Sequence, residues 1–150
     1  MSPGRHGDAG SRSAEEELPA CRADDVSVTV RWERDGGGLR GQVIAENAGS
    51  RACRLAGKPE VTPLGLDGQP LPTQTLVTLE ALLPGYVVLE PGQRAAAPVT
   101  WGGWGGAAAS PRARVTWESD AVTAAVHGPA QPASPGPPCH LSSSWFRLLR

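Results

Sequence analysis

The stretch Glu46-Asn47-Ala48-Gly49-Ser50-Arg51-Ala52-Cys53-Arg54-Leu55 decides the fold of this chain of 150 residues. Asn47 to Ser50 indicates a turn between two strands, because asparagine and glycine suit the backbone conformations of tight turns. Cys53 follows the turn. From there it can reach back toward the first strand, which begins shortly after Cys21. This arrangement is typical of a small, disulfide-braced β-sandwich and not of a catalytic centre.

Apolar and polar residues alternate upstream of this turn, which is the pattern of a half-buried strand. The apolar positions are Val26, Val28, Val30 and Trp32. Asp35-Gly36-Gly37-Gly38 follows and predicts a hairpin turn, since glycine accepts the positive φ angles that such turns need. Residues 39–46 then return as the second strand.

The rest of the chain continues as short segments between turn signals. We expect further strands at 51–55, 59–66, 86–89, 95–101, 114–118, 121–127 and 141–146. Pro63 places its strand at a sheet edge, because proline lacks a backbone donor. Pro91 and Gly92 predict a type II turn. About seven to nine strands at a spacing of roughly 8–12 residues predict an all-β, antiparallel sandwich.

The chain divides into three parts by composition. Residues 1–20 are poor in large apolar groups and are expected to be a disordered leader, 21–147 form the sandwich, and 148–150 are a tail. The net charge is −1 and the arginines are dispersed, which argues against nucleic acid as a partner. No segment reaches the roughly 18–20 apolar residues of a membrane span.

Three cysteines are present, Cys21, Cys53 and Cys139, and none belongs to a C-x-x-C pair. An odd number leaves at least one thiol over if a disulfide forms within the chain. A disulfide favours export from the cytoplasm. The polar residues 1–20 do not resemble a signal peptide, which conflicts with export.

Four segments, taken in order and spacing, carry a resemblance to a known family. They are Cys21-Arg-Ala-Asp-Asp-Val26, Asn47-Ala-Gly-Ser-Arg-Ala-Cys-Arg-Leu-Ala-Gly-Lys-Pro59, Leu89-Glu-Pro-Gly-Gln-Arg-Ala95 and Trp101-Gly-Gly-Trp104. The chain resembles the actinobacterial family named domain of unknown function 4232 over residues 21–146. The resemblance implies an exported or lipid-anchored Ig-like β-sandwich with no settled activity, and the GC-rich codon bias of the composition agrees with an actinomycete.

The resemblance also implies which cysteines pair. It places a disulfide between Cys21 and Cys53, and closing that loop would stabilise the fold by about 3–4 kcal/mol in the chain-entropy model. Many relatives carry another cysteine directly after the second tryptophan, where this chain has Gly105. Cys139 is therefore expected to be an unpaired thiol. The motif residues Asn47, Gly49, Pro91 and Gly92 are expected to be structural turn residues.

Candidate catalytic and metal-binding groups are few. Cys139 and His140 are adjacent, but neighbours on a strand point to opposite faces, so the imidazole is poorly placed to activate the thiol. His6 and His127 lie far away in sequence, so a zinc site is not expected. No G-x-S-x-G motif occurs. We therefore expect no enzyme activity, no cofactor and no bound metal.

The tryptophans offer the strongest candidate for a binding surface. Trp101 ends a strand and Trp104 lies in a glycine-rich loop, where an exposed indole could stack on a sugar or anchor a partner. The alternative is that Trp104 folds over the end of the sandwich, because large aromatic side chains usually find cover.

The leading functional hypothesis is a non-catalytic binding or structural module of the cell envelope, whose partner is an unknown protein or glycan. The alternative is a carbohydrate-binding β-sandwich that uses Trp101 and Trp104. The expected location is extracellular or in the envelope. We expect a monomer, with a dimer linked through Cys139 as the alternative.

Overall fold

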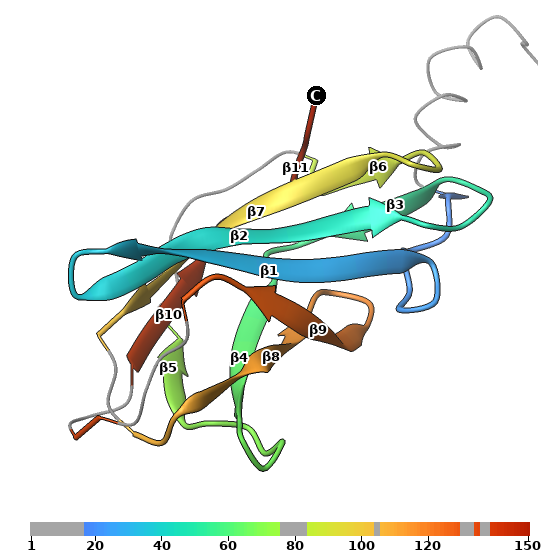
Figure 1. Ribbon diagram of the computed structural model, residues 1–150. Helices are drawn as coiled ribbons and strands as arrows, with labels where there is room; N and C mark the ends of the chain where they lie inside the picture. Colours follow the sequence, from blue (N-terminus) through green and yellow to red (C-terminus); the bar gives the residue numbers. More distant parts are fainter. Residues whose placement is uncertain (1–16, 76–83, 104–105, 130–133, 136–138) are drawn as a thin grey trace, which may run out of the picture.

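The computed structural model describes residues 17–75, 84–103, 106–129, 134–135 and 139–150, and of Thr75 and Cys139 it describes the backbone alone (Figure 1). The strands are β1 (Val26–Asp35), β2 (Gly38–Asn47), β3 (Cys53–Ala56), β4 (Glu60–Gly65), β5 (Thr73–Thr75), β6 (Tyr86–Leu89), β7 (Arg94–Gly102), β8 (Ala109–Thr116), β9 (Ala121–His127), β10 (Cys139–Ser143) and β11 (Arg147–Leu148). The predicted all-β fold is confirmed. Trp104 and the predicted leader up to residue 16 lie outside the described residues.

The hairpin of β1 and β2 lies in the middle of the main sheet. Its antiparallel register runs without a break from the pair Val26 and Asn47 to the pair Asp35 and Gly38. Gly36, in the connecting loop, has a φ of 60°, as the sequence predicted for a tight glycine turn. The other edge of β2 pairs antiparallel with β7. Figure 1 shows these three strands running side by side across the molecule.

Most strands belong to one continuous sheet in the order β4-β8-β9-β1-β2-β7-β10-β5, with β11 also paired to β7. β3 and β6 form a separate two-stranded ribbon. The pairs β1 with β9 and β10 with β5 are parallel, so the sheet is mixed where we expected antiparallel strands throughout. The strand with Pro63, β4, lies at one end of the order, as the sequence predicted.

The sheet bends so that its two halves, β4-β8-β9 and β1-β2-β7, face each other across one core. In Figure 1, β4, β8 and β9 lie below β1, β2 and β7. The core collects inward-facing residues from both halves, including Val30, Val43, Ala97 and Val115. The Ser143 hydroxyl on β10 donates a hydrogen bond to the Pro59 carbonyl oxygen just before β4. This contact brings together two strands that are far apart in the sheet order.

The folded unit extends past both expected boundaries. The backbone N–H of Arg54 donates a hydrogen bond to the Pro19 carbonyl oxygen, and its side-chain Nε donates to the Leu18 carbonyl oxygen. At the other end, the Leu149 N–H donates to the Arg94 carbonyl oxygen. Residues 18–20 and 148–149 therefore pair with the sheets and belong to the folded unit. Among the described residues, no helix is long and apolar enough to cross a membrane.

Gly41 marks a close approach of the two hairpin strands. A Cβ at this position would overlap the Arg31 carbonyl oxygen on β1. We expect Gly41→Ala to lower the free energy of unfolding by about 2 kcal/mol, since relief of the overlap requires a backbone shift. Urea denaturation would measure the loss. Gly37→Ala, in the same hairpin and with no heavy atom within 4 Å of an added Cβ, is the matched control; equal stability of the two variants would contradict the prediction.

Candidate functional site

The register of β1 and β2 gives the molecule two distinct ends. Val26 pairs with Asn47 at one end, and Asp35 pairs with Gly38 at the other. Cys21 precedes the first of these pairs, so the disulfide and the Asn47 turn share one end. Trp32 on β1 and Trp101, which pairs with Leu39, lie toward the hairpin end. The two ends have different chemistry.

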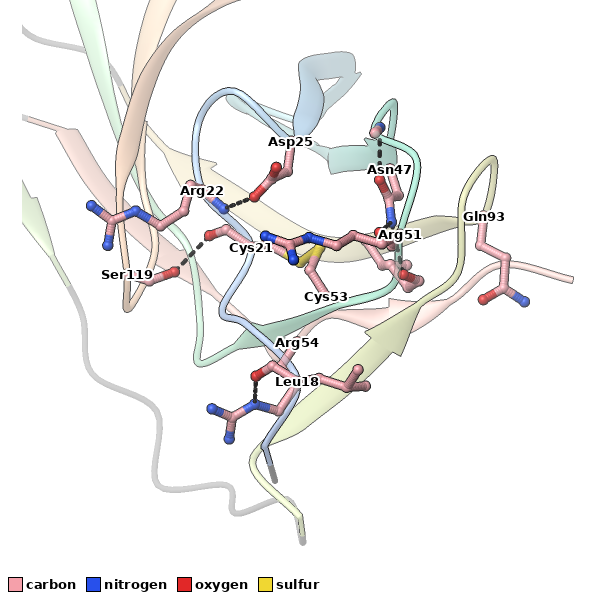
Figure 2. The surroundings of a disulfide bond; sticks show 12 residues. Leu18, Cys21, Arg22, Asp25, Asn47, Arg51, Cys53, Arg54, Gln93 and Ser119 are labelled. Atoms are coloured by element: carbon pink, nitrogen blue, oxygen red, sulfur yellow. Dashed lines mark hydrogen bonds between the residues drawn. A yellow bond between two sulfur atoms is a disulfide. The ribbon is translucent and has the colours of Figure 1, made fainter. Parts of the chain in front are cut away.

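The disulfide joins the segment before β1 to the first residue of β3 (Figure 2). Cys21 and Cys53 are bonded, with their Cα atoms 4.9 Å apart and 32 residues apart in sequence. The two side chains are almost completely buried. The Cys21 carbonyl oxygen accepts hydrogen bonds from Trp117 Nε1 at 2.9 Å and from Ser119 Oγ at 2.7 Å. The implied pairing of Cys21 with Cys53 is thus present in the structure.

Asn47 connects the two turns that the sequence identified separately. Its side chain is 1% exposed. Nδ2 donates to the carbonyl oxygens of Arg51 at 2.9 Å and Leu89 at 2.8 Å, while Oδ1 accepts from the Gly49 N–H at 2.8 Å. The Gly92 N–H donates to the Asn47 carbonyl oxygen. The 47–50 turn and the 90–93 turn therefore form one hydrogen-bonded unit.

A second polar network fixes the segment between Cys21 and β1. Asp120 Oδ2 accepts a hydrogen bond of 2.7 Å from the Ala23 N–H, and Arg22 Nε lies 3.7 Å from the same oxygen. The backbone N–H groups of Ala23 and Ala121, together with the Arg22 charge, hold the pKa of Asp120 below its ordinary value. The carboxylate therefore stays ionised at neutral pH, and its contribution to stability is lost only as the pH falls through the lowered pKa.

The polar groups at the disulfide end are directed at backbone atoms of the same chain. Asn47, Ser119 and Asp120 each bind one or more backbone partners. Such satisfied buried groups hold neighbouring loops in place. These hydrogen bonds therefore hold the loops of the disulfide end together.

A cavity of about 230 Å³ opens at the hairpin end, between the two halves of the sheet. Trp32 and Trp101 both line it, with ring centroids 5.4 Å apart and planes inclined at 58°. The remaining lining residues are mostly apolar: Val61, Pro63, Ala109, Ser110, Pro111, Arg112, Ala113, Val126, Gly128 and Pro129. The cavity is therefore suited to an apolar group.

Local sequence explains why this space is not filled. Positions on β8 that face the interior carry small side chains, Ala109 and Ala113, opposite the two indoles. The pairing of β4 with β8 is also irregular between Pro63 and Gly65, where the register shifts. Gly128 directly follows β9, has a φ of 112°, and brings its backbone so close to Trp32 that a Cβ would overlap the Trp32 carbonyl oxygen. The small residues of β8 and the register shift in β4 together leave the cavity open at this end of the sheet.

The structure corrects the expectation that Trp101 is a surface residue. Its side chain is 3% exposed, because Trp101 continues the inward-facing series of Ala95, Ala97 and Val99 along β7. Its indole therefore offers no exposed face to a sugar, although Trp101 is among the residues that line the cavity. The other candidate for that surface, Trp104, lies outside the described residues.

The remaining candidate residues do not come together. His127 ends β9 and His140 lies on β10, and both are exposed. Of Cys139 the structure describes only the backbone, which pairs with Thr73. No group of three or more His, Cys, Asp or Glu side chains that could hold a metal ion occurs in the described part of the chain.

The alternation of residues 26–32 places Trp32 in the core, where the structure has it, but it does not predict the cavity beside it. The signal that could have suggested an opening is the stretch from Ala107 to Ala113, which consists of small residues apart from Pro111 and Arg112. Sequence alone could not have shown that β8 lies across from Trp32. That neighbour relation depends on the parallel pairing of β1 with β9.

Comparison with known proteins agrees with the motifs. A family model described as Domain of unknown function (DUF4232) matches residues 21–144. No curated protein matches the chain, and no solved structure does. The matched segment begins at the disulfide cysteine Cys21 and ends in the loop after β10, so it spans nearly all of the folded unit. The chain belongs to the DUF4232 family of domains of unknown function.

Proposed function

We propose that this domain is a non-catalytic binding module that acts outside the cytoplasm and holds an apolar group in the cavity above Trp32 and Trp101. The observation that carries the proposal is the cavity itself, because a mostly apolar hollow lined by two indoles favours the transfer of apolar surface out of water. The disulfide end supports the module as a rigid scaffold.

The size of the cavity limits what it can hold. A volume of about 230 Å³ is below the roughly 300–1,000 Å³ of pockets that enclose drug-sized molecules. It exceeds the roughly 150 Å³ of an engineered protein cavity that accepts benzene. The proposed occupant is thus one apolar group, such as a short alkyl chain.

Two further observations support this reading. The described polar side chains near the disulfide bind backbone atoms and leave no constellation of nucleophile, base and oxyanion donors on that part of the structure. The buried disulfide between Cys21 and Cys53 is compatible with an oxidising compartment such as the cell envelope. The carbohydrate alternative is weaker, because the Trp101 indole is buried.

Octanol binding tests the proposed function. We expect isothermal titration of the full chain with octanol to show saturable binding, and Ala109→Leu to weaken it by about tenfold, because three added carbons occupy the cavity. Ala109 is a partly buried lining residue. Ala121→Leu is the matched control, since Ala121 is also half-buried on a strand but lies outside the lining; it should change affinity by less than about twofold.

Two outcomes would contradict the proposal. If octanol did not bind, the cavity would hold no apolar group of this size. If Ala109→Leu and Ala121→Leu weakened binding equally, the site would lie elsewhere. Thermal unfolding of each variant without octanol would show whether the substitution had disturbed the fold.

A further inference from the structure

We propose that the outer face of β8, β9 and β1 binds a linear polyanion, a polymer that carries phosphate groups along its length. Three exposed arginines from distant parts of the sequence share this face, and we call the surface they form the arginine face: Arg31 on β1, with Arg112 and Arg114 on β8. It is a second surface of the domain, and its partner is independent of any occupant of the cavity.

The strand register places the three arginines on one side of the sheet. Arg112 pairs with Ala125 on β9, and Ala125 pairs in turn with Thr29 on β1. Arg114 lies two residues after Arg112 on the same strand. Arg31 likewise lies two residues after Thr29. Because side chains two residues apart on a strand share a face, all three arginines point to the outer side.

The residues between these positions face the other way. Ala113, which lies between the two arginines of β8, is buried, and so is Val30, which precedes Arg31. At about 3.3 Å per residue and about 4.8 Å between strands, the Cα atoms of Arg112 and Arg31 are about 12 Å apart. Those of Arg112 and Arg114 are about 7 Å apart. The charges are therefore spaced along the sheet rather than stacked at one point.

The surface between the arginines is small and uncharged. Thr123 on β9 pairs with Arg114, and Ala125 pairs with Arg112, and both of these β9 residues are exposed. His127, also exposed, pairs with Arg31 in the next row. Because no long side chain stands on β9 between the arginines, the three guanidinium groups are accessible from the same side.

The positive charge of the arginine face is not cancelled within the described part of the chain. Among the described residues, no ion pair includes these arginines, and the pairs that occur join Arg22 with Asp120 and Arg40 with Glu33. Arginine keeps its charge at any physiological pH. The face therefore carries three permanent charges on a chain whose net charge is only −1.

Carboxylates border the arginine face but do not separate its members. Glu60 on β4 pairs with Thr116, two residues beyond Arg114. Glu33 lies two residues beyond Arg31, and its carboxylate is 3.9 Å from Nε of Arg40. The potential over the face is consequently positive between two acidic margins, which favours an anionic partner of limited width.

The composition of the face selects a polymer over a membrane surface. A guanidinium donates two parallel hydrogen bonds to a phosphate group, and a chain of phosphates offers one such acceptor after another. A bilayer would also be held by apolar side chains that enter it. The outer positions of β8 and β9 carry only polar or small side chains: Ser110, Arg112, Arg114, Thr116, Ala121, Thr123, Ala125 and His127.

Long-chain inorganic polyphosphate tests the inference on the full chain by isothermal titration at low salt. We expect saturable binding that weakens as salt is added, because bound arginines release counterions from the polymer. Orthophosphate at the same phosphate concentration should bind at least about tenfold more weakly, since its charges are not linked to one another.

A combined variant tests whether the arginine face is the binding surface. We expect it to lower polyphosphate affinity at least about tenfold and to reduce the salt dependence; it contains Arg31→Gln, Arg112→Gln and Arg114→Gln. A matched variant removes three exposed arginines outside this face and should change affinity less than about twofold; it contains Arg94→Gln, Arg147→Gln and Arg150→Gln. Both variants have the same net charge.

Thermal unfolding of each variant checks the fold, and the single variant Arg114→Gln, with an expected loss of about twofold, serves if the combined variant is unstable. Failure of the unmodified chain to bind polyphosphate would overturn the inference, as would equal losses in the two combined variants. Tighter binding to phosphatidylglycerol vesicles or to single-stranded DNA than to polyphosphate, at equal phosphate concentration, would also overturn it, because the partner would then be a membrane or a nucleic acid.

Discussion

Removal of the disulfide is expected to lower the free energy of unfolding by about 3–4 kcal/mol. The Cys21–Cys53 bond closes a loop with a sequence separation of 32, and cross-linking a loop of this length restricts the unfolded chain by about that amount. The double variant Cys21→Ala with Cys53→Ala is preferred, because a single variant would leave a thiol that could pair with Cys139. Urea denaturation of oxidised protein and of the double variant would measure the difference.

Reductant provides the control for this prediction. Cys139→Ser should unfold at the same urea concentration as the unmodified chain, and reductant should destabilise both equally, because Cys139 does not take part in the bond. Peptide mapping of the oxidised protein should link Cys21 to Cys53. A map that links Cys139 to either of them, or a double variant as stable as the oxidised chain, would contradict the prediction.

The strands were predictable because their signals are local. Alternation from Val26 to Trp32, the glycine turn after Asp35 and the turn at Pro91 each depend on a few neighbouring residues. The structure places β1, the hairpin and β9 at the expected positions. At the 90–93 turn, Gly92 has a φ of 83°, and the Gln93 N–H donates to the Glu90 carbonyl oxygen. Backbone and side-chain preferences over short distances are sufficient for such elements.

The order of the strands was not predictable in the same way. Alternation shows which side chains face the core, but it contains no information about the direction of the neighbouring strand. The parallel pairs of β1 with β9 and of β10 with β5 are therefore visible only in the structure. β5 was missed altogether, since Thr73–Thr75 lies in a proline-rich stretch and takes its extended form from pairing with β10.

The candidate site shows the same limit. The alternation along β7 correctly placed Trp101 in phase with Ala95, Ala97 and Val99, and that phase directs it inward. The expectation of an exposed indole gave more weight to its position at a strand end. Whether an inward-facing indole is covered depends on the opposing strand, and here β8 offers Ala109 and Ala113. The cavity is therefore a property of two segments brought together by the fold.

The Asn47 side chain should have an effect comparable to that of the disulfide. We expect Asn47→Ala to lower the free energy of unfolding by about 3–4 kcal/mol, because the substitution leaves the buried Leu89 carbonyl oxygen and the partly buried Arg51 carbonyl and Gly49 N–H without their partner. Each unsatisfied buried group costs about 1–3 kcal/mol. Urea denaturation would measure the loss, and hydrogen exchange should show faster exchange at the Gly49 N–H.

Two further variants distinguish the hydrogen bonds of Asn47 from a general effect of losing an amide. Gln42→Ala removes an exposed amide from the same strand, so we expect a change within about 0.5 kcal/mol. Asn47→Asp retains the acceptor for Gly49 but replaces the donor to Arg51 and Leu89 with an oxygen, and at neutral pH it should be at least as damaging as alanine. Its deficit should diminish as acid protonates the new carboxyl group, because the protonated form can donate to one of the two carbonyl oxygens. If Asn47→Ala were as stable as Gln42→Ala, the prediction would be wrong, because the two turns would then be held together by the strands alone.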